Sequence, residues 1–107
     1  MTWSILLTEE AKAEIRKLSP DLRARFAAVA DLLLENGPMS VGMPYVRPIE
    51  AKLWEMRLKG KDGIARAIYF AASGRRIVVL TAFVKKTETT PRRIINVALR
   101  RMRMFDV

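Results

Sequence analysis

Residues 77–84, with the sequence IVVLTAFV, are apolar at every position except Thr81. So short a run without polar alternation is typical of a strand buried on both faces, because a strand with one wet face alternates apolar and polar residues. Lys85 and Lys86 follow the run directly. We therefore expect a sheet that is covered on both sides, with residues 77–84 as a central strand.

Two more strands are predicted just before this run. Residues 52–59 alternate in polarity, which is the pattern of a strand. One of its faces carries Trp54, Met56 and Leu58, and the other carries Leu53, Glu55, Arg57 and Lys59. Residues 60–63 (GKDG) have turn chemistry, residues 64–72 form the next strand, and Ser73-Gly74 begin another turn. We expect these three strands to pair in sequence order.

The N-terminal part predicts a strand and a helical hairpin. Trp3 to Leu7 is a short apolar run, and Thr8 can cap a helix over about residues 9–18. Ser19-Pro20 is typical of the start of a second helix, and Asn36-Gly37-Pro38 of its end. The apolar face of this second helix consists of Leu22, Phe26, Val29 and Leu33.

Proline and glycine mark the two remaining segments. Residues 38–51 hold three prolines and a glycine, and we expect no regular element there. Thr90-Pro91 predicts the cap and first position of a C-terminal helix. Its apolar stripe would be Ile95, Ala98, Leu99, Met102 and Phe105, and its charge would come from Arg92, Arg93, Arg100, Arg101 and Arg103.

Composition excludes several kinds of function. A chain of 107 residues suits one compact domain, so we expect residues 1–107 to fold together. The chain has no cysteine and no histidine, which removes disulfides, thiolate chemistry, the usual general base and the commonest metal ligand. We expect neither a metal nor a cofactor. The sequence shows no secretion signal. It also has no apolar stretch close to the roughly 20 residues that a membrane-spanning helix needs, so we expect a cytoplasmic protein.

Positive charge is concentrated in the second part of the chain. The net charge is +9. Residues 47–107 hold fifteen Lys and Arg against five Asp and Glu, whereas residues 1–46 hold five against six. Such a local excess favours an anionic partner, and RNA is the partner we expect. The alternative is a basic protein with an ordinary solvated surface.

Four residues on the predicted sheet could carry chemistry. Glu55 and Arg57 share the polar face of one strand, Arg66 lies in the next strand, and Lys85 ends the third. Gathered at one phosphodiester, such cations would stabilise the charge that develops when the ribose 2′-OH attacks phosphorus. Glu55, or a lysine with a lowered pKa, would take the 2′-OH proton. The alternative for Glu55 is a structural ion pair with Arg66 or Lys85.

The C-terminal half resembles a known family. The pattern LWEMRL, then GIARAIYF, then VLTAFVKKT with TPRR a few residues on is similar to the RelE/ParE toxin superfamily, and most to its phage-derived, HigB-like branch. The match covers about residues 53–102. This resemblance implies an α+β fold, with an N-terminal helical hairpin packed on a twisted, mainly antiparallel sheet and a C-terminal helix.

The resemblance also implies a function. It implies a toxin of a type II toxin–antitoxin system, a ribosome-dependent endoribonuclease of mRNA, with Arg57, Arg66, Lys85 and Glu55 at the catalytic site. The implied partners are the ribosome, mRNA and a cognate antitoxin of helix-turn-helix type. The toxin would bind operator DNA only as part of the complex with this antitoxin, and no membrane is involved. We expect further RNA contacts at Lys59, Lys86, Arg92, Arg93 and Arg100. The alternatives are a gyrase-inhibiting toxin of the same fold and a non-catalytic nucleic-acid- or antitoxin-binding module.

Overall fold

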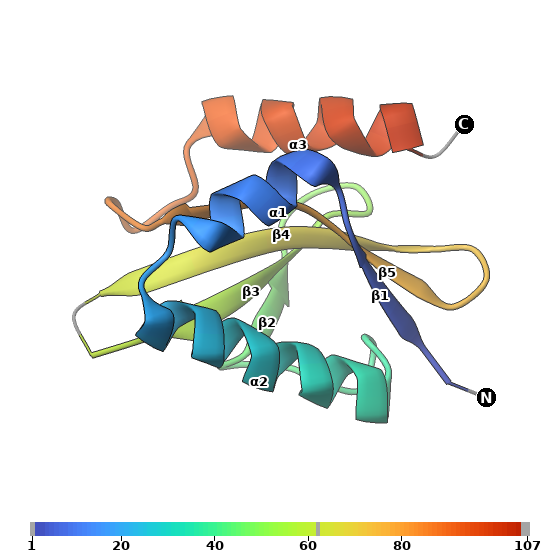
Figure 1. Cartoon of the computed structure of the whole chain (residues 1–107). Helices are drawn as coiled ribbons and strands as arrows, with labels where there is room; N and C mark the ends of the chain where they lie inside the picture. The colour runs from blue at the N-terminus through green and yellow to red at the C-terminus, as the bar shows by residue number, and fades with distance from the viewer. Residues whose placement is uncertain (1, 62, 106–107) are drawn as a thin grey trace.

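A computed structural model describes residues 2–61 and 63–105 of the chain. Its centre is a five-stranded sheet with the order β1-β5-β4-β3-β2. β1 runs parallel to β5, and the other neighbouring strands are antiparallel. Two helices, α1 and α2, precede most of the sheet, and α3 follows it (Figure 1). The expected α+β architecture, with a helical hairpin, a mainly antiparallel sheet and a C-terminal helix, is confirmed.

The N-terminal elements begin and end where local chemistry allows. β1 (Ser4–Leu7) leads into α1 (Glu9–Arg16), where the Thr8 side chain accepts a hydrogen bond from the Ala11 backbone N–H at 3.1 Å. α2 (Pro20–Asn36) starts in the same way, with the Ser19 hydroxyl accepting from Leu22 N–H at 3.3 Å. It ends at Asn36 and is followed by Gly37, whose φ of 82° suits a residue without a Cβ. Both predicted caps are confirmed, and α1 is two residues shorter than expected.

The three predicted strands pair in sequence order. They are β3 (Trp54–Lys59), β4 (Ile64–Ala72) and β5 (Arg76–Val84). β5 lies between β1 and β4, and residues 77–82 are buried, as expected for a central strand covered on both faces. In this register Arg57 of β3 lies directly opposite Arg66 of β4, and Arg66 lies opposite Phe83 of β5.

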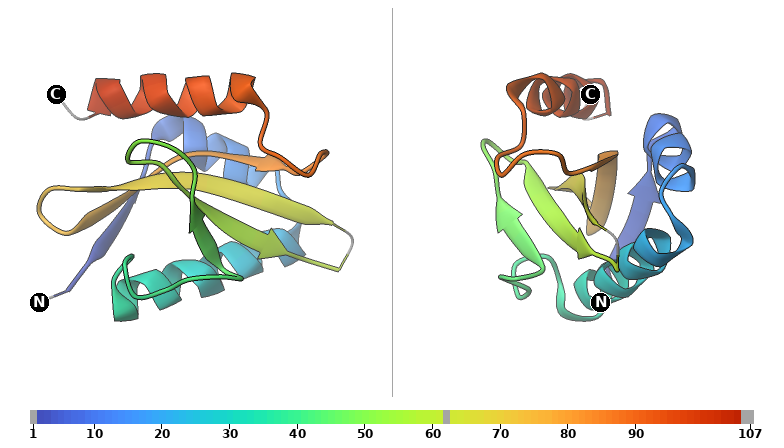
Figure 2. Two further views of the ribbon diagram at one scale, coloured as in Figure 1. Left: turned by 180° about the vertical axis from the view of Figure 1, so that it is seen from behind. Right: turned by 90° about the vertical axis from the view of Figure 1, so that its left-hand side faces the viewer.

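The helical hairpin covers one face of the sheet. Met56 and Leu58 of β3 are fully buried there and pack in one apolar cluster with α1 and α2. The predicted face of α2 is largely confirmed: Leu22, Val29 and Leu33 are buried, and Phe26 packs against the same cluster while partly exposed. α2 and α3 lie on opposite sides of the sheet (Figure 2).

α3 (Arg92–Phe105) packs on the other face. Its predicted apolar stripe is confirmed: Ile95, Ala98, Leu99, Met102 and Phe105 contact a second cluster built from β4 and β5. The Phe105 ring meets Phe70 edge-on at 6.1 Å between centroids, and the Arg76 guanidinium lies 5.5 Å from the Phe105 centroid. Arg57 and Arg66 lie on the same face, at the border of this cluster, because Phe83, the pairing partner of Arg66, packs against it.

The expectation of no regular element in residues 38–51 is wrong at one place. β2 (Val46–Pro48) pairs antiparallel with β3, and Arg47 lies opposite Glu55. Proline lacks the N–H of a ladder donor, but it is tolerated on an edge strand, and β2 is the edge of this sheet. No helix in the described residues is long and apolar enough to cross a membrane.

Candidate functional site

The four residues expected to carry chemistry line one small pocket on the α3 side of the sheet. Its volume is about 100 Å³. β2, β3, β4 and the segment after β5 all contribute to its wall: Met43, Pro44, Val46, Arg47, Glu55, Arg57, Arg66, Lys85 and Glu88. The structure therefore brings Glu55, Arg57, Arg66 and Lys85 together, along with one further arginine and one further acid.

Glu55 is the buried centre of this group, with an exposed fraction of 2%. Its Oε1 accepts a hydrogen bond from Arg47 Nε at 3.0 Å and lies 3.6 Å from Arg66 Nε. Its Oε2 accepts a short hydrogen bond from the Thr90 hydroxyl. Both carboxylate oxygens are thus engaged, and Glu55 ties β2, β4 and the start of the α3 region to β3.

Arg66 is almost as deeply buried, at 5% exposure. Besides its ion pair with Glu55, it donates from Nη1 to the Thr90 hydroxyl at 3.1 Å and from Nη2 to the Glu88 carbonyl oxygen at 2.9 Å. A guanidinium has five N–H groups, so one N–H on each Nη remains for a ligand. Arg66 fixes the segment after β5 and still presents donors to the pocket.

Arg57 and Lys85 are the more available cations. The Arg57 side chain is exposed and has no ion pair or hydrogen bond within the described part of the chain. Lys85 is 14% exposed and lies 3.3 Å from a Glu88 carboxylate oxygen, but the Glu88 side chain is 94% exposed. An anion in the pocket can displace so exposed a carboxylate at little cost, because surface ion pairs are weak.

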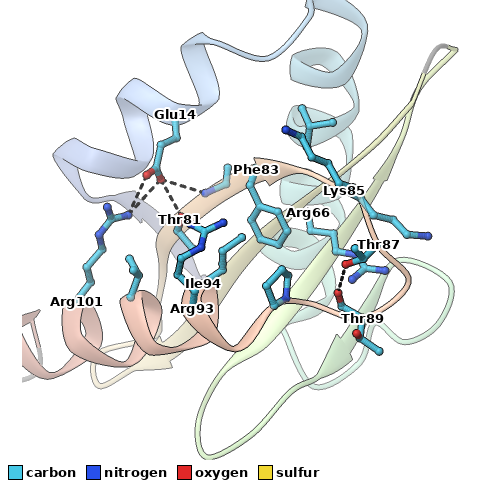
Figure 3. A pocket seen from close by; sticks show the side chains of 15 residues that line it. Glu14, Arg66, Thr81, Phe83, Lys85, Thr87, Thr89, Arg93, Ile94 and Arg101 are labelled. Atoms are coloured by element: carbon cyan, nitrogen blue, oxygen red, sulfur yellow. Dashed lines mark hydrogen bonds and ion pairs between the residues drawn. The ribbon is translucent and has the colours of Figure 1, made fainter.

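A larger groove adjoins the small pocket. Its volume is about 710 Å³, and it lies between β5, the segment after it and α3 (Figure 3). Arg66 and Lys85 line both spaces and so form the boundary between them. Its wall combines apolar and cationic side chains, among them Phe83, Lys86, Pro91, Arg93, Ile94 and Val97.

The five residues expected to make further RNA contacts are not all equally placed. Lys86 and Arg93 line the large groove, whereas Lys59 and Arg100 are exposed but line neither space. Arg92 donates two hydrogen bonds to Glu50, at 3.0 and 2.8 Å, and this bonding lowers the pKa of Glu50. Arg92 therefore links α3 to the segment before β3, and its expected RNA contact stays a prediction.

Besides Glu88, which lines the small pocket, three other residues at the site were not predicted from the sequence to take part in it. Arg47 lies in the segment where no element was expected, and only its pairing opposite Glu55 brings it to the pocket. Thr90 was expected to cap α3, but α3 begins at Arg92 and the Thr90 hydroxyl bonds Glu55 and Arg66 instead. Glu14 of α1 bonds Arg101, the Thr81 hydroxyl and the Ala82 N–H at 3.0–3.2 Å, closing the far end of the groove.

Within the described residues, no group of three or more acidic side chains lies close enough together to hold a metal ion. The chemistry offered by the two spaces is that of clustered guanidinium and ammonium groups. Such groups bind phosphate, bidentately where an arginine is free to turn its planar fork toward it.

Comparison with known proteins identifies the class. The model of the family described as phage-derived protein Gp49-like matches residues 13–103. The chain therefore belongs to this family, a RelE-type toxin family, and the expected RelE superfamily assignment is confirmed.

A solved structure supports the same fold. An arginine double mutant of the E. coli toxin RelE, in the free state, superposes with a TM-score of 0.68 at 19% identity, over 95% of this chain and 99% of that one. A search of curated protein sequences finds no significant match. The chain thus has the RelE fold and belongs to a toxin family.

Proposed function

We propose that this protein is the toxin of a type II toxin–antitoxin system and cleaves mRNA in the ribosome without a metal ion. Membership of a RelE-type toxin family supports the toxin role. The observation that carries the cleavage reaction is the convergence of Arg57, Arg66 and Lys85 on one pocket of about 100 Å³. The scissile phosphate binds there, and the three cations stabilise its growing negative charge.

The reaction balances without any added reagent. The ribose 2′-oxygen forms a bond to phosphorus, the bond from phosphorus to the 5′-oxygen breaks, and the products are a 2′,3′-cyclic phosphate and a 5′-hydroxyl. One proton leaves the 2′-OH and one is taken up by the 5′-oxygen. Arg57 and Lys85 contact the phosphate, and Arg66 adds its two remaining N–H groups.

Two carboxylates line the pocket, and they differ in availability. Both oxygens of Glu55 accept hydrogen bonds or ion pairs, so we assign Glu55 to positioning Arg66 and Arg47. Glu88 keeps an oxygen outside its pair with Lys85 and is largely exposed. Glu88, rather than Glu55, is therefore the residue that we assign as the acceptor of the 2′-OH proton.

The basic surface supplies the remaining partners. Lys59, Lys86, Arg93 and Arg100 are exposed cations that suit the phosphates of ribosomal RNA and of the mRNA beside the cleavage point. The cognate antitoxin, of helix-turn-helix type, neutralises the toxin and carries it to operator DNA. The resemblance of residues 53–102 to the HigB-like branch supports this kind of antitoxin.

Inducing the chain alone in cells tests the proposal. We expect growth arrest and new mRNA ends with 5′-hydroxyls within translated frames, and we expect Arg57→Ala to lower the cleavage rate by about 100-fold or more. Cleavage that persists unchanged in Arg57→Ala places the reaction elsewhere. DNA breaks with intact mRNA would instead support the gyrase-inhibiting alternative. Absence of both effects would support a binding module.

A further inference from the structure

The large groove differs from the small pocket in size and in chemistry. The pocket of about 100 Å³ is lined mainly by charged groups, as suits a phosphate. The groove of about 710 Å³ has the size of a small-molecule site, and its lining combines apolar and cationic side chains. Arg66 and Lys85 line both the pocket and the groove. An RNA strand with one phosphate in the pocket would therefore place its adjacent nucleotide in the groove.

Phe83 provides a flat apolar surface inside the groove. It lies on β5 opposite Arg66, is partly buried against the second cluster, and projects among Arg66, Arg93 and Ile94 in Figure 3. A single aromatic ring beside a phosphate-binding group is a common means of holding a base of single-stranded nucleic acid. The ring is thus placed to stack with a group that adjoins the phosphate.

The groove also offers a hydrogen-bonding hydroxyl and two cations. Thr89 lines it, and its hydroxyl has no partner in the described part of the chain, so it can meet the polar edge of a base. Lys86 and Arg93 also line it and are likewise without ion pairs among the described residues. An acidic peptide would satisfy the two cations, but it would not use the continuity with a phosphate pocket.

We propose that the groove is a nucleobase subsite. The base next to the scissile phosphate stacks on Phe83, the Thr89 hydroxyl bonds its edge, and Lys86 and Arg93 hold the following phosphate. This inference rests on the proposed function and adds to it a determinant of base preference. It assigns roles to Phe83 and Thr89, residues that the cleavage reaction itself does not require.

A binding cycle tests the contact directly. The probe is a short single-stranded RNA from a mapped cleavage site, bound to the ribosome as mRNA and made uncleavable by 2′-O-methyl riboses, in versions that each lack one base. We expect Phe83→Leu to weaken binding of the complete RNA by about 5- to 50-fold. One of the RNA versions should bind the wild-type protein as weakly as the complete RNA binds Phe83→Leu. For that version, Phe83→Leu should weaken binding further by less than about 2-fold.

Three comparisons keep this result specific. Phe83→Tyr should retain the affinity because it keeps the ring, and Phe26→Leu, which removes a ring on the opposite face of the sheet, should leave RNA binding unchanged. Equal melting temperatures of wild type and Phe83→Leu exclude a folding defect. Phe83→Leu should also alter the base found beside mapped cleavage sites.

Some results would overturn the subsite. If wild type cuts mRNA but Phe83→Leu and every missing base act additively, the subsite is wrong while the proposed function stands. The same holds if Phe83→Leu leaves RNA affinity intact and instead weakens binding of a Glu- and Leu-rich peptide, which identifies the groove as a peptide site. If wild type neither cuts nor binds RNA, the proposed function fails and the subsite fails with it.

Discussion

The two faces of the sheet are built from the same strands but are completed differently. Under α1 and α2, the side chains of β3 and β4 are apolar and closed from water, with Met56, Leu58 and Ala65 fully buried. On the α3 side, the same strands present Glu55, Arg57 and Arg66. α3 covers an apolar cluster on that face, and the charged end lies at the border of the cluster.

Because the two faces differ, neighbouring residues of one strand can have different roles, one in stabilising the fold and the next in binding a ligand. In a strand, successive side chains point to opposite faces, so one residue can serve the core and the next can serve a ligand. The hairpin face provides hydrophobic stabilisation that does not depend on the site. The charged end of the other face can then gather several cations around Glu55, because the hydrophobic core on the hairpin face offsets the cost of burying charge.

Leu58→Ala should have the largest effect on stability. Leu58 is fully buried on the hairpin face, and its loss leaves a cavity between β3 and the helices. We expect the free energy of unfolding to fall by about 3–5 kcal/mol, measured by urea denaturation. The neighbouring substitution Arg57→Ala should change it by less than about 0.5 kcal/mol. A large loss of stability in Arg57→Ala would show that the two faces are not independent.

Glu55→Gln should have an intermediate effect, because Glu55 forms a buried ion pair with Arg66 within the charged end. Removing its charge leaves Arg66 without its buried partner, and we expect a loss of about 2–3 kcal/mol in unfolding free energy. The matched variant Glu88→Gln changes a carboxylate of the same pocket that is 94% exposed. It should leave stability unchanged but lower the cleavage rate at saturating RNA. If Glu55→Gln keeps full stability and only cleavage falls, the positioning role is wrong.

The sequence predicted the parts of the fold that depend on local pattern. The alternation of residues 52–59, the unbroken run at 77–84 and the caps at Thr8 and Ser19 are each set by neighbouring residues, and each is found in the structure. It also allowed the placing of Arg57 beside Arg66, because a short turn between two strands fixes their register.

Interactions between distant segments could not be predicted in this way. β2 is three residues long and contains Pro48, so it is a strand only because β3 supplies its partners. Thr90 has the chemistry of a helix cap, yet its hydroxyl is used by Glu55, which lies 35 residues earlier. Glu55 is occupied by hydrogen bonds and an ion pair from Arg47, Arg66 and Thr90, which come from other segments of the chain. The sequence around Glu55 does not reveal these contacts.

Tyr69→Phe should have the smallest effect and would sharpen the description of the hairpin face. Tyr69 is fully buried in that cluster, and its hydroxyl has no hydrogen-bond partner among the described residues. Its removal should change the free energy of unfolding at neutral pH by less than about 1 kcal/mol. Burial raises the pKa of Tyr69 above its ordinary value of 10.0.

The raised pKa fixes the sign of a pH dependence. Above about pH 10 the unfolded chain releases the phenol proton while the folded chain retains it, so stability falls as pH rises through this window. Wild type should therefore lose more stability than Tyr69→Phe between pH 9 and 11, roughly the window around the ordinary tyrosine pKa. Lysines titrate in the same window, so the measurement is the difference between the two proteins. Tyr45→Phe, at a position 42% exposed, should behave as wild type. An equal decline in wild type and Tyr69→Phe would mean that water or a partner reaches the hydroxyl, and that the hairpin face is less closed than the fully buried side chains around it indicate.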